Sequence, residues 1–294
     1  MTAGERGGEG RVLAVTDLGP GGLAAIRAAA ERARATGGVL AVVHVMPPLD
    51  RVRPLFPQHL AADALSQVEL PRLVRGAVDR QLAEAAPEAQ AEVILAEGGD
   101  AEQVLRVADE WRADLIAVGG AVDTPGIDAE RIVRHAHVPV LVVRDGPDRG
   151  PILACTDFSD PALPAVHAAA REAARTGEPL IVAHALEPVP HAMVGIEGIG
   201  LIPSREWELE RRKNAEERLA AALAQLEVAG EYVAVEGPVV SALVGLARER
   251  AARWMVIGTI GRTGLTRFLL GSVAEGLVRH APCPTMVVRL HRDG

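Results

Sequence analysis

Residues 152–158 read ILACTDF, and a near copy, VLAVTDL, stands 140 positions earlier at residues 12–18. Each copy begins as a short apolar run, which is typical of a buried parallel strand. A second apolar run follows in each case and contains a histidine, His44 in the first and His184 in the second, again 140 positions apart. Similar segments at a fixed interval predict that the chain contains a duplicated structural unit.

A third pair of matching blocks closes the two copies. Residues 129–144 read AERIVRHAHVPVLVVR, and residues 274–289 read AEGLVRHAPCPTMVVR, now 145 positions apart. Three blocks in the same order at nearly one spacing predict two tandem domains. The polar stretch DGPDRGP at residues 145–151 is rich in proline and glycine, as linkers are, and we therefore expect domains at 1–147 and 148–294.

Apolar runs alternate with helical stretches inside each copy. In the second copy we expect strands at 152–156, 180–184, 231–235, 254–257 and 285–289, with helices before about 176 and at 205–229, 241–252 and 272–280. Ser159 and Asp160 are expected to cap the first helix, and Gly177 to end it. Strands joined by helices indicate right-handed crossovers and a parallel sheet covered on both faces. The predicted fold class is therefore α/β, with two doubly wound parallel sheets.

Composition narrows the classes of function. The net charge is −8 and only 2% of the residues are aromatic, which disfavours a nucleic-acid-binding surface. No apolar run is as long as a membrane span, and residues 1–10 contain no apolar segment of an export signal. Cys155 and Cys283 form no CxxC motif and lie in or beside apolar runs, so we expect buried structural thiols. Free thiols favour a cytoplasmic location. Because no apolar run is as long as a membrane span, we expect no membrane partner.

A glycine-rich loop follows the fourth expected strand of the second copy. It reads GTIGRTGLTRFLLGSVAEG and contains Gly258, Gly261 and Gly271, with Ser272 directly after the third glycine. Glycine lets the backbone approach an anion closely and point successive N–H groups at it. The helix that begins at Ser272 adds N–H groups and a dipole that favour negative charge. The loop is therefore a candidate phosphate-binding site.

Charge and position support this interpretation, but a structural alternative is open. Arg262 and Arg267 lie in the stretch 258–271, which contains no acid. The loop also follows the carboxyl end of a strand, where α/β sheets bind ligands. Against this, Ser272 and Glu275 have the S-x-x-E spacing of a helix capping box, which needs no ligand.

The G-x2-G-x9-G-S pattern of this loop resembles the ATP-binding signature of the universal stress protein family. The resemblance extends to the opening ILACTDFSD, the strand with His184, the turn at Gly237-Pro238 and the closing APCPTMVVR, so it covers essentially the whole second half. The first half is similar at VLAVTDL, VVHVMP, ADLIAVGG and VPVLVVR. The whole chain thus resembles a tandem universal stress protein.

The resemblance implies five strands per domain in the order 3-2-1-4-5, with the nucleotide at the switch point between strands 1 and 4. It implies that Asp157 lies near the adenine and ribose, that the backbone at Ala185 borders the adenine, and that the glycine loop holds the phosphates of ATP together with Mg²⁺ or Mn²⁺. The expected nucleotide-binding residues are Thr156, Asp157, Ala185, Gly258, Gly261, Arg262, Gly271, Ser272 and Val273. One departure from the family pattern is Arg253, where the first half keeps the more usual aspartate as Asp114.

The first half lacks the features of the loop. Six residues separate the terminal glycines of the stretch 119–126, whereas twelve separate those of the stretch 258–271. The middle glycine is missing, and Ile127 stands where the second half has its serine. Asp123 and Asp128 add negative charge, which repels a phosphate. We therefore expect no nucleotide in the first half.

The predicted function is an ATP-binding regulatory protein of the stress response, with the nucleotide in the C-terminal domain. Two alternatives stay open: a slow ATP hydrolase or a phosphoryl- or adenylyl-transferring enzyme, and a structural pseudo-dimer without nucleotide. The sequence offers no catalytic residue and no set of protein metal ligands. His44 and His184 are expected to be hydrogen-bonded core histidines. The apolar last strands at 139–144 and 284–289 are expected to join the halves in an intramolecular pseudo-dimer, and a homodimer is left open.

Overall fold

The chain is described as two compact units that meet in sequence between Arg144 and Asp145. The computed structural model describes residues 10–48, 69–120, 128–159, 162–187, 205–225, 229–259 and 270–289. Each unit repeats the alternation of strands and helices that the sequence predicts.

The first unit contains five strands and the helices that connect them. Its elements are β1 (Arg11–Thr16), α1 (Pro20–Thr36), β2 (Val39–Met46), α3 (Glu69–Ala85), β3 (Ala91–Glu97), α4 (Asp100–Glu110), β4 (Leu115–Gly119), α5 (Ala129–His135) and β5 (Val140–Val143).

The second unit has the same alternation of strands and helices, although its elements differ in length from those of the first. Its elements are β6 (Ile152–Cys155), α6 (Leu163–Thr176), β7 (Leu180–Leu186), α7 (Arg205–Gln225), β8 (Glu231–Glu236), α8 (Val239–Glu249), β9 (Trp254–Gly258), α9 (Ser272–His280) and β10 (Thr285–Val288).

The strand order within each unit is the one that the resemblance implies. The first unit has the order β3-β2-β1-β4-β5, and the second has the matching order β8-β7-β6-β9-β10. The paired strands are parallel in both units. The α/β fold class and the strand order are therefore confirmed. In each unit the order of connections reverses beside the first strand, which creates a crevice at the carboxyl ends of the strands.

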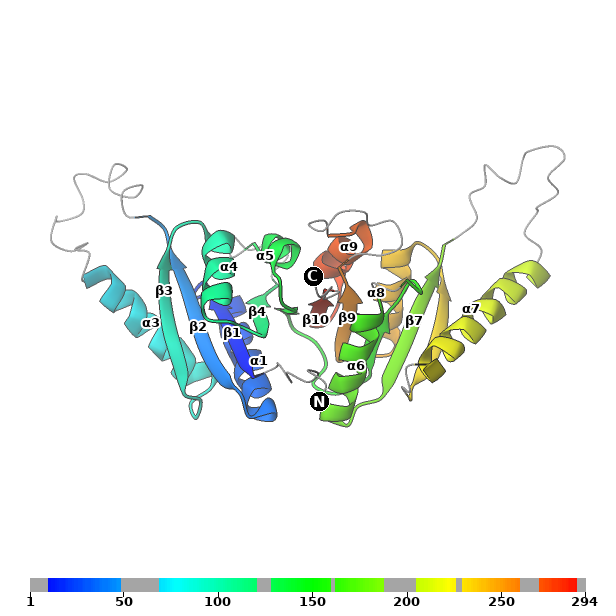
Figure 1. Cartoon of the computed structure of the whole chain (residues 1–294), viewed down its shortest axis with the longest axis horizontal. Helices are drawn as coiled ribbons and strands as arrows, with labels where there is room; N and C mark the ends of the chain where they lie inside the picture. Colours follow the sequence, from blue (N-terminus) through cyan, green and yellow to red (C-terminus); the bar gives the residue numbers. More distant parts are fainter. Residues whose placement is uncertain are drawn as a thin grey trace, which may run out of the picture. The chain divides into compact units, whose positions relative to one another are not determined.

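Helices cover both faces of each sheet (Figure 1). In the first unit α1 packs against α3 and α4 packs against α5, and in the second α8 packs against α9. The chain runs from β1 to β3 through α1 and α3, and in the opposite direction from β3 to β5 through α4 and α5. Because these crossovers are right-handed, the two helix pairs lie on opposite faces of the sheet. The central strands are consequently buried on both faces: β6 is buried at every residue, and β1 at every residue but its first. The edge strands β3 and β8 keep exposed charged residues.

Two of the expected helix boundaries are informative. Gly177 ends α6 in the left-handed conformation with φ 70°, as predicted, because glycine adopts this conformation without steric cost. Ser159 does not cap α6 as expected: the helix begins at Leu163, and no side chain of the described residues caps it. Ser159 bonds to Asp157 instead, and Asp160 lies outside the described residues.

No helix in the described parts of the chain is long and apolar enough to cross a membrane.

Candidate functional site

Sheet register brings several of the predicted site residues to one edge of the second unit. Ala154 of β6 pairs with Val256 of β9, so Thr156, two residues farther along, stands level with Gly258. Cys155 pairs with Ala183 of β7, and the Thr156 N–H donates to the Ala183 carbonyl oxygen at 3.0 Å, so Asp157 follows β6 beside the carboxyl end of β7. Since parallel strands end at the same edge, these residues line the crevice at the switch point.

The turn after β6 has a fixed shape. The Thr156 hydroxyl accepts a hydrogen bond from the Phe158 N–H at 3.1 Å, and Asp157 Oδ1 accepts one from the Ser159 N–H at 3.0 Å. The Ser159 hydroxyl also donates to Asp157 Oδ1. Phe158 has φ 64°, an unusual conformation for a bulky residue that requires support from its surroundings. Side chains of the turn therefore hold its own backbone in place.

His184 supports the same turn from the neighbouring strand. Its Nδ1 lies 2.9 Å from the Thr156 carbonyl oxygen. Because a carbonyl oxygen can only accept, Nδ1 carries the proton and donates. The ring of His184 also packs against the ring of Phe158, with 4.4 Å between their centroids. His184 is thus a hydrogen-bonded histidine of the fold, as the sequence suggested.

The start of α9 forms the other side of this edge. The Gly271 N–H donates to the Thr259 carbonyl oxygen at 2.9 Å, which holds the two ends of the loop together. Gly271 is the N-cap residue, with φ −65° and ψ 150°, and no side chain in the described part of the chain caps the helix. Ser272 and Val273 are exposed in the first turn. A helix N-terminus of this kind leaves backbone donors available to an anion.

The capping-box alternative fails on this geometry. A capping box needs its serine at the N-cap position, but Ser272 is the first helical residue. Glu275, the other member of the expected box, forms an ion pair with Arg279 at 3.3 Å. The serine therefore has no structural capping role. Gly261 and Arg262, which the sequence also assigns to this site, lie outside the described residues.

The corresponding edge of the first unit has the same turn. His44 Nδ1 lies 2.8 Å from the Thr16 carbonyl oxygen, the Leu18 N–H donates to the Thr16 hydroxyl at 2.9 Å, and Leu18 has φ 66°. In the first unit, however, the side chain of Gln81 from α3 also contacts the turn. The Thr16 hydroxyl donates to Gln81 Oε1, and Gln81 Nε2 donates to the Gly19 carbonyl oxygen at 2.9 Å. Thr16 is completely buried as a result.

Two further contacts close this edge in the first unit. A Cβ on Gly119 would lie 2.6 Å from backbone atoms of Gly21, so the start of α1 packs directly on the end of β4. Asp128 is the N-cap of α5, and its carboxylate accepts a hydrogen bond from the Arg131 N–H at 2.9 Å. The helix end that would attract a phosphate thus already holds a negative charge. Asp123 lies outside the described residues.

Sequence reasoning missed Gln81 and the role of Asp128 as a cap. An Asp three residues before Arg131 is a recognisable cap signal. Gln81 gives no comparable signal, because it lies in the middle of a charged helix, 65 residues from Thr16 in sequence.

The buried thiol near the site is chemically inert. Burial, together with the nearby Cys283, raises the pKa of Cys155 to about 12. The thiol is therefore protonated at neutral pH and cannot act as a nucleophile. Within the described residues, no group of three or more His, Cys, Asp or Glu side chains could hold a metal ion.

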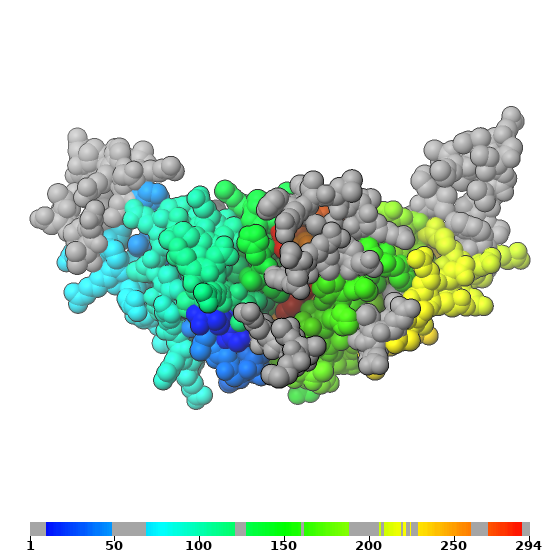
Figure 2. Space-filling model, viewed as in Figure 1, coloured from blue at the N-terminus to red at the C-terminus, as the bar shows by residue number. Residues whose placement is uncertain are grey.

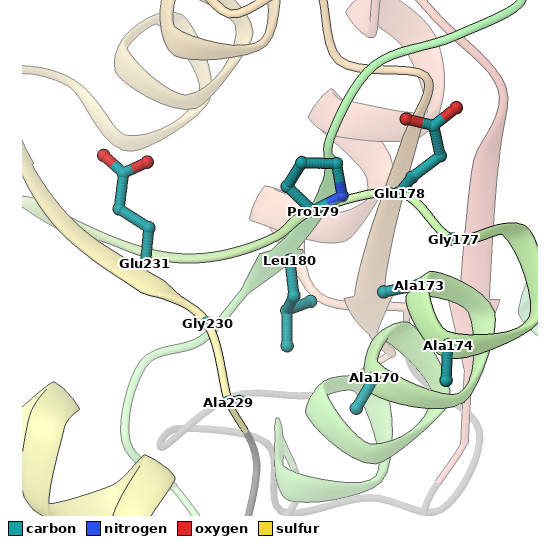
Figure 3. A pocket seen from close by; sticks show the side chains of 10 residues that line it. All are labelled: Ala170, Ala173, Ala174, Gly177, Glu178, Pro179, Leu180, Ala229, Gly230 and Glu231. Carbon is teal, nitrogen blue, oxygen red and sulfur yellow. The ribbon is translucent and has the colours of Figure 1, made fainter.

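A hollow at the opposite edge of the second unit is distinct from this site (Figure 3). It is lined by Ala170, Ala173, Ala174, Gly177, Glu178, Pro179, Leu180, Ala229, Gly230 and Glu231. Arg250 donates to the Glu231 carboxylate at 2.9 and 3.0 Å and holds the pKa of Glu231 below its ordinary value. Glu178 pairs with Arg253 at 3.8 Å. Arg253, the departure from the family pattern, therefore serves the edge remote from the glycine loop.

Comparison with known proteins identifies the class that this fold and repeat define. The sequence model of the Universal stress protein family matches the chain twice, at residues 10–144 and 149–289. The chain therefore belongs to the universal stress protein family and contains two of its domains in tandem.

Individual relatives agree with this assignment. A universal stress protein of Thermus aquaticus is 35% identical over 140 residues, which is 47% of this chain and 97% of that protein. One of Methanocaldococcus jannaschii is 36% identical over 97 residues, 31% of this chain and 57% of that protein. One of Mycobacterium tuberculosis is 30% identical over 167 residues, 54% of this chain and 53% of that protein. The matches thus span little more than half the length of the last two relatives.

A solved structure extends the comparison to nearly the full length. The crystal structure of a universal stress protein from Archaeoglobus fulgidus has a TM-score of 0.64 and 18% sequence identity, and it covers 98% of both chains. A likeness at this level of identity concerns the fold.

Proposed function

We propose that this protein binds ATP in its C-terminal unit and acts as a cytoplasmic regulatory protein of the stress response. The proposal rests on one difference between the two repeats. The N-terminus of α9 is capped by no side chain of the described residues and exposes Ser272 and Val273, whereas the matching helix α5 carries its own Asp128 carboxylate. A triphosphate at α9 would take the place that Asp128 takes at α5.

The adenosine would bind at the neighbouring strand ends. Thr156 and Asp157 directly follow β6, whose last registered partners are Ala183 of β7 and Val256 of β9. Thr156 is half-buried, in contrast to the fully buried Thr16. Its hydroxyl accepts from the Phe158 N–H and finds no acceptor for its own proton among the described residues. A ligand oxygen or nitrogen could accept that proton.

The residues present fit a divalent cation that is carried by the nucleotide. When bound, Mg²⁺ or Mn²⁺ would neutralise part of the charge on the phosphate oxygens. Because the described residues contain no cluster of three potential protein ligands, we assign the cation to phosphate oxygens and water. The protein's part is then to hold the phosphates with backbone N–H groups at the start of α9.

A binding role is favoured over catalysis because the titratable groups at this edge already have structural partners. Asp157 Oδ1 accepts two hydrogen bonds from Ser159. His184 Nδ1 donates to the Thr156 carbonyl oxygen. Both contacts hold the backbone of the turn, whereas hydrolysis or group transfer requires a base aimed at the reacting atoms. We therefore expect stoichiometric ATP and metal to remain mostly intact over minutes.

Two measurements test the proposal. Denaturing the purified protein and analysing the released small molecules by mass spectrometry should detect ATP. Titration calorimetry of the nucleotide-free protein with ATP and Mg²⁺ should then give one site per chain. Two equivalent sites per chain would refute the assignment to one repeat, and no binding at all would refute the function. The association of the halves through their last strands, residues 139–144 and 284–289, stays a separate prediction.

A further inference from the structure

Three of the α7 side chains that the structure describes contact the rest of the unit from one face of the helix. Arg211 Nη2 donates to the Glu187 carbonyl oxygen at 2.6 Å, just beyond the end of β7. Ala215, four residues on, is buried in a small cluster with Leu186 and Ala234. Arg218, three residues farther, places its guanidinium 4.9 Å from the centre of the Phe158 ring. Residues spaced in this way share one side of a helix.

The last of these contacts reaches the proposed nucleotide site. Phe158 directly follows Asp157, and its ring contacts both His184 and Arg218. The left-handed conformation of Phe158 is unfavourable for a bulky residue and persists only where the surroundings hold it. Arg218 therefore helps to hold the turn that presents Asp157. It does so by a cation–π contact from an exposed side chain.

The matching helix of the first unit is fastened differently. Val78 of α3 is completely buried, and Gln81 forms two hydrogen bonds to the turn after β1. On α7, Ala215 is the buried residue among the side chains that the structure describes. Most of the others are exposed, and α7 forms a strip of the molecular surface (Figure 2, yellow). Helix α3 is thus fixed to its turn, whereas α7 is joined to its turn by a weaker and more exposed contact.

We propose that Arg218 is a positioning residue of the nucleotide site, and that through it α7 becomes more ordered when ATP binds. The inference rests on the proposed function. A nucleotide that contacts Asp157 and the backbone at Ala185 restrains the turn, and a restrained Phe158 ring is a better surface for the guanidinium. Coupling of this kind is reciprocal, so Arg218 also strengthens binding of the adenosine part.

Calorimetry with two ligands tests the positioning role. Mg-ATP and Mg-tripolyphosphate are titrated into the full chain and into Arg218→Ala, Arg218→Lys and Arg212→Ala. Arg218→Ala should lower the affinity for ATP by about two- to fivefold, the range expected for an exposed cation–π contact. Tripolyphosphate affinity should not change, since it engages α9 and not the turn. Lysine should restore most of the ATP affinity because it keeps a cation over the ring.

Arg212→Ala is the matched control. Arg212 is the neighbour of Arg211 on the same helix, is exposed, and pairs with Glu216 at 3.4 Å away from the turn. Its replacement removes the same charge from α7 without touching Phe158. ATP affinity should therefore equal that of the unmodified chain. An equal loss in both alanine variants would overturn the inference in favour of a general charge effect.

Hydrogen exchange tests the ordering of α7. Saturating Mg-ATP should slow amide exchange over residues 205–225 in the unmodified chain and much less in Arg218→Ala. Residues 69–85 of α3 serve as the reference within the same sample and should not respond. Unchanged ATP affinity in Arg218→Ala, or α7 exchange that ignores ATP, would overturn the inference while leaving the proposed function intact. If the unmodified chain binds neither ATP nor tripolyphosphate, both the function and the inference fall.

Discussion

The turns after β1 and β6 have nearly the same backbone and different surroundings. The distance from the histidine Nδ1 to the threonine carbonyl oxygen is 2.8 Å in one and 2.9 Å in the other, and the φ angles of Leu18 and Phe158 are 66° and 64°. In the first unit Gln81 occupies the threonine hydroxyl, and in the second Arg218 lies over the phenylalanine ring. The duplicated strands thus keep the same turn, while a different helix side chain contacts it in each unit.

The N-termini of α5 and α9, the helices that follow the fourth strand of each unit, also differ between the two units. The N-cap of α5 is Asp128, which binds the Arg131 N–H, and the N-cap of α9 is Gly271, which has no side chain to offer. One carboxylate against one glycine therefore separates a self-capped helix from one that can accept an external anion. Substitutions that make one repeat resemble the other test this difference.

The largest effect is expected when the start of α9 is made to resemble that of α5. Gly271→Asp should weaken Mg-ATP binding at least about tenfold, because a carboxylate at the N-cap repels the phosphates and competes for the same N–H groups. The same change should raise the free energy of unfolding by only about 0.3 kcal/mol, since glycine is itself a favourable N-cap residue. A Cβ at this position lies 3.4 Å from the Thr259 carbonyl oxygen, an ordinary contact. Calorimetry and denaturant unfolding measure the two effects.

The reverse change in the first unit is the control. Asp128→Ala removes the cap of α5 and should lower the free energy of unfolding by about 1 kcal/mol, with ATP affinity unchanged. If Gly271→Asp binds ATP normally while Asp128→Ala loses it, the two repeats have been assigned the wrong way round.

A smaller effect, on stability alone, is expected from removing the side chain that closes the first site. Gln81→Ala leaves the buried Thr16 hydroxyl without its acceptor and should cost about 1–3 kcal/mol of unfolding free energy. Arg218→Ala, which removes an exposed contact at the matching turn, should cost less than about 1 kcal/mol. Equal costs in urea unfolding would contradict the distinction between the two helices. The number of ATP sites should stay at one, because Asp128 and the contact between Gly21 and Gly119 remain.

The smallest effect concerns the buried thiol beside the second turn. Cys155 stands where the first repeat has Val15, and its pKa is raised to about 12 from the usual 9.0. Above pH 9 the unfolded chain releases this proton while the folded chain retains it, so stability falls as pH rises toward 12. Cys155→Val should therefore reduce the loss of unfolding free energy between pH 8 and pH 10 by about 1 kcal/mol. If the unfolding free energy of Cys155→Val and of the unmodified chain depended on pH in the same way, the Cys155 thiol would not be the cause of the loss.

Much of the architecture could be read from local signals. The spacing of the repeats predicted two α/β units, and short apolar runs located the strands to within about two residues. Gly177 ends its helix as expected, because the left-handed conformation is a property of a single residue. Ser159 does not cap its helix as expected, and the alternative of a capping box at Ser272 fails, for a related reason. A cap depends on the dihedral angles at one residue, and both serines lie one or more positions away from the N-cap that the fold selects.

The order of residues is enough to predict the duplication, the succession of elements and the contrast between a long basic glycine loop and a short acidic one. These follow from periodicity and spacing along the chain. Tertiary structure alone decided that Gln81 reaches Thr16 and that Arg218 reaches Phe158, over separations of 65 and 60 residues. The physical reason is that helix packing sets the angle at which α3 and α7 cross their sheets. That angle selects which helix residue arrives at a strand end, and no local pattern in the sequence encodes it.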